Sequence, residues 1–210
     1  MMRATFVSGW AHDARSLEPL SLQLADLLSV TLCGFDEAEK AASLEADVIL
    51  GWSMGGLIAQ ELAAKRAVKL VLISSTPRFC SAPDFSCGTP ERELRALASG
   101  IRKDAEKMVE GFMVYAAEPH TPLHRAPPCD LAMLAAGLKY LQHTDLRHLR
   151  ITCPTLILHG RQDRVIPWQA SQWLADHIPG ARLDLLDGVG HDLPIRCCKE
   201  IANAVRKWIA

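Results

Sequence analysis

Short apolar runs alternate with stretches of helical spacing along most of the chain. Three runs, Val48–Leu50, Leu70–Ile73 and Leu156–Leu158, are apolar without interruption. A strand that is buried on both faces of a parallel sheet has this continuous pattern, whereas a half-exposed strand alternates. The predicted strands are Ala4–Ser8, Val30–Cys33, Asp47–Leu50, Val68–Ser74, Pro154–His159 and Arg182–Leu186.

Helical spacing separates most of these strands. The last helical stretch opens with a proline near its first turn, where a missing N–H costs little. Strands that alternate with helices predict an α/β protein with a mostly parallel six-stranded sheet and helices on both faces. The predicted helices are Ser16–Leu28, Met54–Lys65, Trp168–Ile178 and Pro194–Ile209.

One long segment, from Pro77 to about Leu149, breaks this alternation because it has no strand pattern. Gly88–Glu91 predicts a helix start within it, and Gly100 is a candidate break. We interpret residues 77–149 as a helical cap inserted into a core of residues 1–76 and 150–210, since long insertions are usually functional. A continuation of the core without a lid role is the alternative. Apolar residues at spacings of three, four, seven and four predict one face of a helix or helix pair: Leu94, Leu97, Ile101, Met108 and Phe112.

Length and composition indicate a globular protein with one buried core. The chain has 210 residues, of which 49% are hydrophobic and 22% charged, and its net charge of -1 gives no overall attraction to nucleic acid or to an anionic membrane. No run approaches the roughly 20 apolar residues that cross a bilayer, and the start has no signal-peptide pattern. We therefore expect a cytoplasmic protein with no nucleic-acid or membrane partner. Its oligomeric state does not follow from these features, and we expect a monomer.

Cysteine and histidine spacing does not favour a disulfide framework or a metal site. The seven cysteines are an odd number without a Cys-x-x-Cys pair, which is typical of reduced thiols that pack as small hydrophobes. His120 and His124 have a metal-compatible spacing, but prolines flank them, so no helix presents both on one face. We expect no metal and no cofactor. The cysteines are at positions 33, 80, 87, 129, 153, 197 and 198.

A glycine-rich turn between a predicted strand and a predicted helix contains Ser53. The sequence Gly51-Trp52-Ser53-Met54-Gly55-Gly56 has the Gly-x-Ser-x-Gly pattern of a nucleophile elbow. Such a turn forces the serine into a strained backbone region, and side chains two residues away on either side would collide with neighbouring elements. A simple glycine-rich loop is the alternative, but the strand before and the helix after it favour a nucleophilic serine.

A serine nucleophile needs a base and an acid, which in this type of turn follow in the order Ser, Asp or Glu, His. Asp163 comes just after the strand Pro154–His159, and His191 follows the strand Arg182–Leu186. Because the ends of parallel strands lie along one edge of a sheet, we expect both to meet Ser53. Asp187 and Asp192 are rival acids, but they lie too close to His191 along the chain.

The oxyanion intermediate of such a reaction needs two main-chain N–H donors. We expect one from Met54, the residue after the nucleophile, and one from Trp10, in the loop after the first strand. Gly9 would let that loop approach closely. The Trp10 ring either walls an acyl pocket or is a packing aromatic.

Taken together, these motifs resemble the α/β-hydrolase superfamily. Within it, the chain resembles the pimeloyl-[acyl-carrier-protein] methyl ester carboxylesterases of biotin synthesis. The superfamily motifs are Ser8-Gly9-Trp10, Gly51–Gly56, Gly160-x-x-Asp163-x-x-x-Pro167 and Gly190-His191. The narrower resemblance rests on Gly51–Gly56, Ser74–Phe79, Val109–Phe112, Gly137-Leu138 and Thr144–Arg147.

The resemblance implies a serine esterase that forms an acyl-enzyme on Ser53 and accepts an ester carried by an acidic carrier protein. It also implies a substrate site of core and cap residues: Trp10, Ser53, Met54, Phe112, Met113, Val114, Tyr115, Ala116 and His191. Positive charge for docking the carrier could come from Arg92, Arg95, Arg102, Lys103 and Lys107. The alternative for these basic residues is an ordinary solvated helix, because acidic residues are interleaved with them.

The sequence departs from the family pattern in three places, two of which affect substrate choice and carrier docking and one the edge of the sheet. Ser8 stands where the superfamily usually has a histidine, Gly111 replaces a basic residue of the docking face, and leading antiparallel strands are expected to be absent. A broad short-chain carboxylesterase or a thioesterase therefore stays an alternative. A non-catalytic binding protein is a further one, although a complete set of three site residues argues against it.

Overall fold

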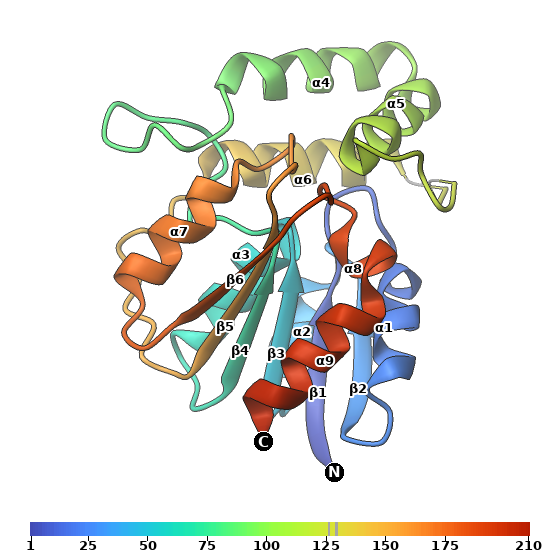
Figure 1. The fold of residues 1–210 in the computed structure, drawn as a ribbon. Coiled ribbons are helices and arrows are strands. Elements are labelled where there is room, and N and C mark those ends of the chain that lie inside the picture. Colours follow the sequence, from blue (N-terminus) through green and yellow to red (C-terminus); the bar gives the residue numbers. More distant parts are fainter. Residues whose placement is uncertain (126, 129) are drawn as a thin grey trace.

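A parallel sheet forms the centre of the molecule (Figure 1). The computed structural model describes residues 1–125, 127–128 and 130–210, and within them six strands pair in the order β2-β1-β3-β4-β5-β6, every pair parallel. Each strand lies within two residues of its predicted range, and the α/β fold is confirmed. The strands are β1 (Met2–Val7), β2 (Leu28–Cys33), β3 (Val48–Trp52), β4 (Lys69–Ile73), β5 (Thr155–Gly160) and β6 (Arg182–Leu186).

Helices cover both faces of this sheet, as predicted (Figure 1). Successive strand residues point to opposite faces, so Leu50 packs with Leu20 and Val205 of one helical layer, whereas Ile49 packs with Leu174 of the other. The first layer consists of α1 (Glu18–Gln23), α8 (Leu193–Arg196) and α9 (Cys198–Ile209). The second consists of α2 (Ala38–Ser43), α3 (Met54–Ala63) and α7 (Trp168–His177).

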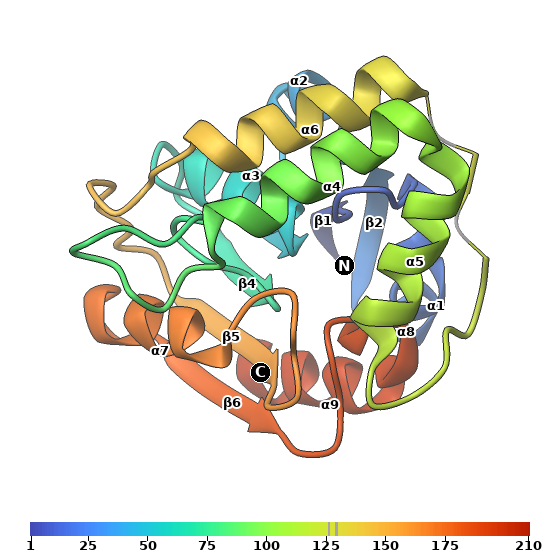
Figure 2. The same cartoon turned by 90° about the horizontal axis from the view of Figure 1, so that it is seen from above.

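Three further helices lie over the carboxyl ends of the strands (Figures 1 and 2). They are α4 (Glu91–Lys103), α5 (Ala105–Ala117) and α6 (Leu131–His143), all between β4 and β5. An apolar cluster that includes Met54, Leu94, Met113 and Leu138 joins them to the core. The two ends of the segment are held together, since Arg78 Nη1 lies 2.6 Å from Asp145 Oδ2 and Leu146 N–H donates to Pro77 O at 2.8 Å.

The first helical prediction was wrong over part of its range. Instead of one helix over Ser16–Leu28, the chain forms a short 3₁₀ helix η1 (Ala14–Leu17), then α1, then turns. Leu28 is already paired with Met2 in the sheet, so strand pairing ends the helical path. The short helix α2 was not predicted.

Two other helix boundaries also differ from the prediction. Gly100 does not break α4; the break comes at Asp104, whose extended backbone ends α4 and whose side chain caps α5. Gly100 instead makes room for Met108, because a Cβ there would lie 2.5 Å from Met108 Sδ. The helix expected over Pro194–Ile209 is interrupted at Cys197, which separates α8 from α9.

The described residues contain no feature that indicates a disulfide framework, a membrane-spanning helix or a metal site. Six cysteines are free, and Cys129 lies outside the described residues. Among the residues that the structure covers, no helix combines the length and the apolar character that a bilayer span requires. Within the same residues, no cluster of three or more metal-ligating side chains is present, and the His120 ring contacts Gly188 O at 2.8 Å.

Candidate active site

Ser53 occupies a tight turn between β3 and α3. Its backbone has φ 57° and ψ −121°, a left-handed conformation that non-glycine residues rarely adopt. The surrounding glycines allow this turn, since a Cβ on Gly51 would lie 2.4 Å from Gly55 O and one on Gly55 would lie 2.3 Å from Val7 O. The strained serine is therefore held by close backbone packing that larger residues would prevent.

The structure brings the three predicted polar side chains into one hydrogen-bonded chain. His191 Nε2 lies 2.8 Å from Ser53 Oγ, and His191 Nδ1 lies 2.7 Å from Asp163 Oδ2. All three residues are buried, with exposures of 7% for Ser53, 7% for Asp163 and 1% for His191. This geometry lets Asp163 fix the imidazole with Nε2 toward the serine hydroxyl, so that the hydroxyl proton can pass to His191.

Asp163 is held by four hydrogen-bond donors. Its Oδ1 accepts from the main-chain N–H groups of Val165 and Ile166, both at 2.9 Å. Its Oδ2 contacts His191 and, at 3.1 Å, Nε2 of His159. Burial alone would raise the pKa of this carboxyl, but the charge of His191 and hydrogen bonds from His159 and His191 outweigh burial and hold the pKa well below its usual range. Asp163 is therefore ionised at neutral pH.

The loop that carries His191 is attached to the end of α5 (Figure 2). His191 N–H donates to Ala116 O at 2.9 Å, and Gly190 packs so closely that a Cβ there would lie 2.1 Å from Glu118 O. From the core side, Trp52 Nε1–H donates to His191 O at 3.0 Å. The position of the imidazole thus depends on both the core and the cap segment.

The two main-chain N–H groups predicted to bind an oxyanion belong to Trp10 and Met54, which flank the nucleophile. Within the part of the chain that the structure describes, neither Trp10 N–H nor Met54 N–H donates a hydrogen bond. Met54 begins α3, whose N-terminal dipole favours negative charge. The loop with Trp10 lies against the nucleophile, because a Cβ on Gly9 would be 3.0 Å from Ser53 Cβ.

Ser8, one of the departures from the family pattern, has a structural role in the same loop. It is fully buried, and its hydroxyl donates to His12 O at 2.8 Å. The bond closes the loop that presents Trp10. The Trp10 ring is fixed as well, with Nε1–H donating to Leu134 O at 2.9 Å and an edge contact to Phe112 at a ring-centroid distance of 5.0 Å.

The five cap residues carried over from the family resemblance are placed differently from one another. Phe112 and Tyr115 line an apolar cavity of about 390 Å³ between α4, α5 and the core, together with Leu97 and Met108. Met113 is buried in the cluster under the cap, and Ala116 supplies the carbonyl that binds the His191 loop. Val114 is 53% exposed on the outer face of α5.

The basic residues expected to dock a carrier lie on the outer surface of the cap. All five are exposed, with four on α4 and Lys107 on α5, and Arg95 approaches Glu91 at 3.6 Å. Arg95 and Arg102 also line a groove between α4 and α6, together with Lys139 and Asp130. The α4 residues are Arg92, Arg95, Arg102 and Lys103.

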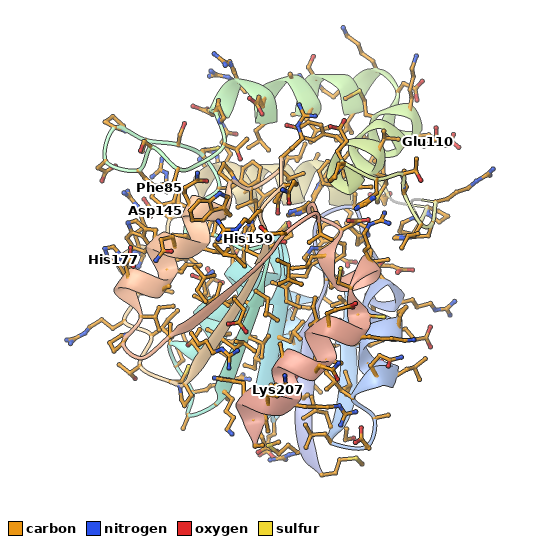
Figure 3. All side chains as sticks on the ribbon, in the orientation of Figure 1. Phe85, Glu110, Asp145, His159, His177 and Lys207 are labelled. Atoms are coloured by element: carbon orange, nitrogen blue, oxygen red, sulfur yellow. The ribbon has the colours of Figure 1, made fainter. Side chains whose placement is uncertain are left out.

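His159 is a site residue that sequence reasoning missed. It lies near the end of β5 beneath the cap, is completely buried and contacts Asp163 (Figure 3). The sequence contained a usable signal, because a histidine within a strand predicted to be buried on both faces must find hydrogen-bond partners.

Comparison with known proteins agrees with this fold. The sequence model of the alpha/beta hydrolase family matches residues 3–204. Pimeloyl-[acyl-carrier protein] methyl ester esterase of Nitrosomonas europaea is 32% identical over 181 residues, which cover 76% of this chain and 72% of that protein. The protein of the same name from Nitrosospira multiformis is 32% identical over 177 residues, covering 76% and 67%.

Solved structures with the same fold are more distant in sequence. An esterase from Exiguobacterium antarcticum has a TM-score of 0.85 at 20% identity, covering 100% of this chain and 92% of that one. A bromoperoxidase from Bacillus anthracis has a TM-score of 0.87 at 20% identity, covering 99% and 91%. The chain belongs to the alpha/beta hydrolase family and is a hydrolase related to esterases of that family.

Proposed function

We propose that this hydrolase is a serine carboxylesterase that cleaves the methyl ester of pimeloyl-[acyl-carrier protein], releasing methanol and the free acid on its carrier in biotin synthesis. The observation that carries the proposal is the hydrogen-bonded chain from Ser53 Oγ through His191 to Asp163. The name of the relatives at 32% identity supports the choice of ester.

In the first half of the reaction, Ser53 is the nucleophile and His191 the general base. As Ser53 Oγ bonds to the ester carbonyl carbon, its proton passes to His191 Nε2 and the carbonyl electron pair moves to oxygen. When that oxygen re-forms the carbonyl, the bond to the methoxy group breaks and His191 returns the proton to it as methanol leaves. Asp163 stays ionised throughout and stabilises the charged imidazole.

The negative oxygen of the tetrahedral intermediate is bound by the N–H groups of Trp10 and Met54. Each such donor is worth about 10²–10³ in rate in other serine hydrolases. Both groups are fixed before substrate binds, Met54 by the first turn of α3 and Trp10 by the loop that Ser8 closes. No reorganisation is then needed as charge develops.

In the second half, water replaces the serine. His191 takes a proton from the water as its oxygen attacks the acyl carbon, and Ser53 Oγ recovers a proton from His191 when the acyl bond breaks. The product is a carboxylic acid, and the enzyme returns to its starting state.

The rest of the substrate would lie between the core and the cap. The apolar cavity bounded by Phe112, Leu97 and Met108 suits a methylene chain. The carrier would dock on the outer cap, where Arg95 and Arg102 face the groove between α4 and α6. An acidic carrier surface is attracted by such charges, and the attraction weakens as salt is added.

The decisive experiment compares a carrier-linked methyl ester with small esters. We expect the purified protein to hydrolyse methyl pimeloyl-[acyl-carrier protein] with a much higher kcat/KM than p-nitrophenyl acetate or butyrate. Ser53→Ala should lose turnover by about 10⁶ and lose labelling by a fluorophosphonate probe. Mass spectrometry of the carrier separates loss of the methyl group from cleavage of the thioester.

Each other outcome would support an alternative. Turnover of small esters only would make the protein a short-chain carboxylesterase, and release of the acyl chain from the carrier would make it a thioesterase. A wild type without labelling or turnover would be a binding protein. Rescue of a biotin-requiring strain that lacks this esterase, with Ser53→Ala as control, tests the role in cells. As part of the same proposal the enzyme is a cytoplasmic monomer, which light scattering and cell fractionation would check.

A further inference from the structure

His159 is a buried, titratable side chain that the reaction described above does not use. It has no exposed surface, and it lies near the end of β5, four residues before Asp163 (Figure 3). A buried polar ring is costly unless its nitrogens are hydrogen-bonded. Both ring nitrogens of His159 have hydrogen-bond partners: Nδ1 contacts Ser171, and Nε2 contacts the carboxylate of Asp163, which also holds His191.

The partners determine where the ring proton lies. His159 Nε2 is 3.1 Å from Asp163 Oδ2 and 3.0 Å from Ile166 O, and both of these atoms can only accept. Nε2 must therefore carry a proton. Nδ1 lies 2.6 Å from Ser171 Oγ, so this hydroxyl orients the other side of the ring.

The same contacts extend from the acid to the turn that carries the nucleophile. The Ser171 hydroxyl donates to Ser75 O at 3.1 Å, and the Ser75 hydroxyl donates to Ser53 O at 3.2 Å. Ser75 and Ser171 are both fully buried. A continuous set of buried polar groups thus connects the carboxylate of Asp163 with the main chain of Ser53.

We propose that His159 is a positioning residue, which holds the Asp163 carboxylate in the orientation that fixes His191 against Ser53. This inference rests on the proposed serine-esterase function. Without the His159 donor, Oδ2 would keep one partner, and the carboxylate could rotate about the two bonds at Oδ1. The imidazole would then lose part of its alignment with Ser53 Oγ.

Loss of the donor also has an electrostatic consequence. His159 Nε2–H draws negative charge on Oδ2 toward itself, and in its absence that charge acts more strongly on His191. The charged imidazole is then favoured, so the acidic limb of kcat/KM against pH should move to higher pH. The other titratable or charged groups on adjoining segments are unchanged by the substitution: His12, Asp192 with Arg196, and Glu118 with Arg164.

The test uses three variants and one control. His159→Phe keeps a ring but removes both nitrogens, His159→Gln keeps a donor for Asp163, and Ser171→Ala removes the hydroxyl that orients His159. His177→Phe, on the exposed side of α7, is the matched control and should behave as wild type. Steady-state kinetics with p-nitrophenyl butyrate would be measured from pH 5 to 9, with urea unfolding to check the fold.

We expect His159→Phe to lower kcat about 10-fold to 100-fold, as for one lost hydrogen bond to a charged group, with little change in KM. The acidic limb of kcat/KM against pH should move to higher pH in His159→Phe. His159→Gln should recover most of the wild-type kcat, and the kcat of Ser171→Ala should lie between those of wild type and His159→Phe. If His159→Phe does not fold, the other two variants decide. The proposal would be overturned if folded His159→Phe or Ser171→Ala kept the wild-type kcat and an unmoved acidic limb. It would also be overturned if folded His159→Gln did not recover kcat.

A spectroscopic measurement separates this inference from the enzymatic proposal. The ¹⁵N spectrum of histidine-labelled wild type should show His159 protonated at Nε2. That result does not depend on turnover, so an inactive wild type would refute the esterase proposal and leave the assignment of His159 standing. A ring protonated only at Nδ1 would refute the contact with Asp163 even in an active enzyme.

Discussion

Replacing Gly190 with alanine should lower activity through the contact between the His191 loop and α5. A Cβ at this position would lie 2.1 Å from Glu118 O and 3.0 Å from Ala116 O. Carbon–oxygen contacts in proteins ordinarily begin at about 3.3 Å. The loop and the end of α5 would therefore have to separate by about 1 Å.

That separation acts directly on the imidazole. His191 N–H donates to Ala116 O, and its Nε2 lies 2.8 Å from Ser53 Oγ, so a shift of the loop moves the base relative to the serine hydroxyl. A misplacement of about 1 Å costs on the order of 100-fold in rate. The crowding itself should cost about 1–3 kcal/mol of unfolding free energy. Both quantities follow from kcat/KM for p-nitrophenyl butyrate and from urea unfolding of Gly190→Ala.

Gly188→Ala, in the same loop, provides the control. Gly188 has φ 77°, so an alanine there is strained, but its Cβ would meet nothing within 4 Å. We expect a loss of about 1–2 kcal/mol in stability with kcat/KM close to that of wild type. If folded Gly190→Ala also kept the wild-type kcat/KM, the attachment to α5 would have no part in positioning His191, and the reasoning would be refuted.

Two other substitutions test the cap. Hydrogen bonds from Arg147, opposed by burial and assisted by Arg78, hold the pKa of Asp145 well below its usual range. Because the folded value is lowered, this stabilisation is present above the unfolded pKa of about 3.9 and is lost as the pH falls below it. The urea midpoint of wild type should therefore drop more steeply below about pH 4 than that of Asp145→Asn; parallel curves would contradict this. If the outer cap docks an acidic carrier, reversing the charge of Arg102, which lines the groove between α4 and α6, should weaken docking. The ratio of KM for the carrier-linked ester to KM for p-nitrophenyl butyrate should then rise in Arg102→Glu, and an unchanged ratio would argue against docking on this face.

The sheet could be predicted because its pattern is local. β3, β4 and β5 are nearly or completely buried, and their continuous apolar runs have no other common explanation in a chain of alternating strands and helices. The order of Ser53, Asp163 and His191 at successive strand ends was equally visible. The catalytic roles of these three residues stay predictions, although the structure brings the side chains together.

Other features depend on tertiary contacts that no local pattern encodes. Helical spacing continues through Gln23 toward Leu28, but pairing of Leu28 with Met2 takes those residues into the sheet. Gly100 is a candidate helix break by residue type alone, but in the structure the side chain of Met108 occupies the space where a side chain at position 100 would lie. His159 looks like one more residue of a buried strand, and its partner Ser171 comes twelve residues later.

The attachment of α5 to the loops of the site was the least predictable feature. It indicates that the cap holds site residues in place in addition to covering them. The loops that carry Asp163 and His191 both contact the segment from Tyr115 to His120. Tyr115 donates its hydroxyl proton to Arg164 O at 2.9 Å in the acid loop, while Ala116 O accepts from His191 N–H in the other. Parallel strands do not fix the loops beyond their ends, so those loops need other partners to hold a constant geometry. The end of α5 supplies such partners, which means that a displacement of this helix would also move the loops that carry the acid and the base. A substrate that packs against Phe112 on the same helix could in this way influence the alignment of His191 without contacting it.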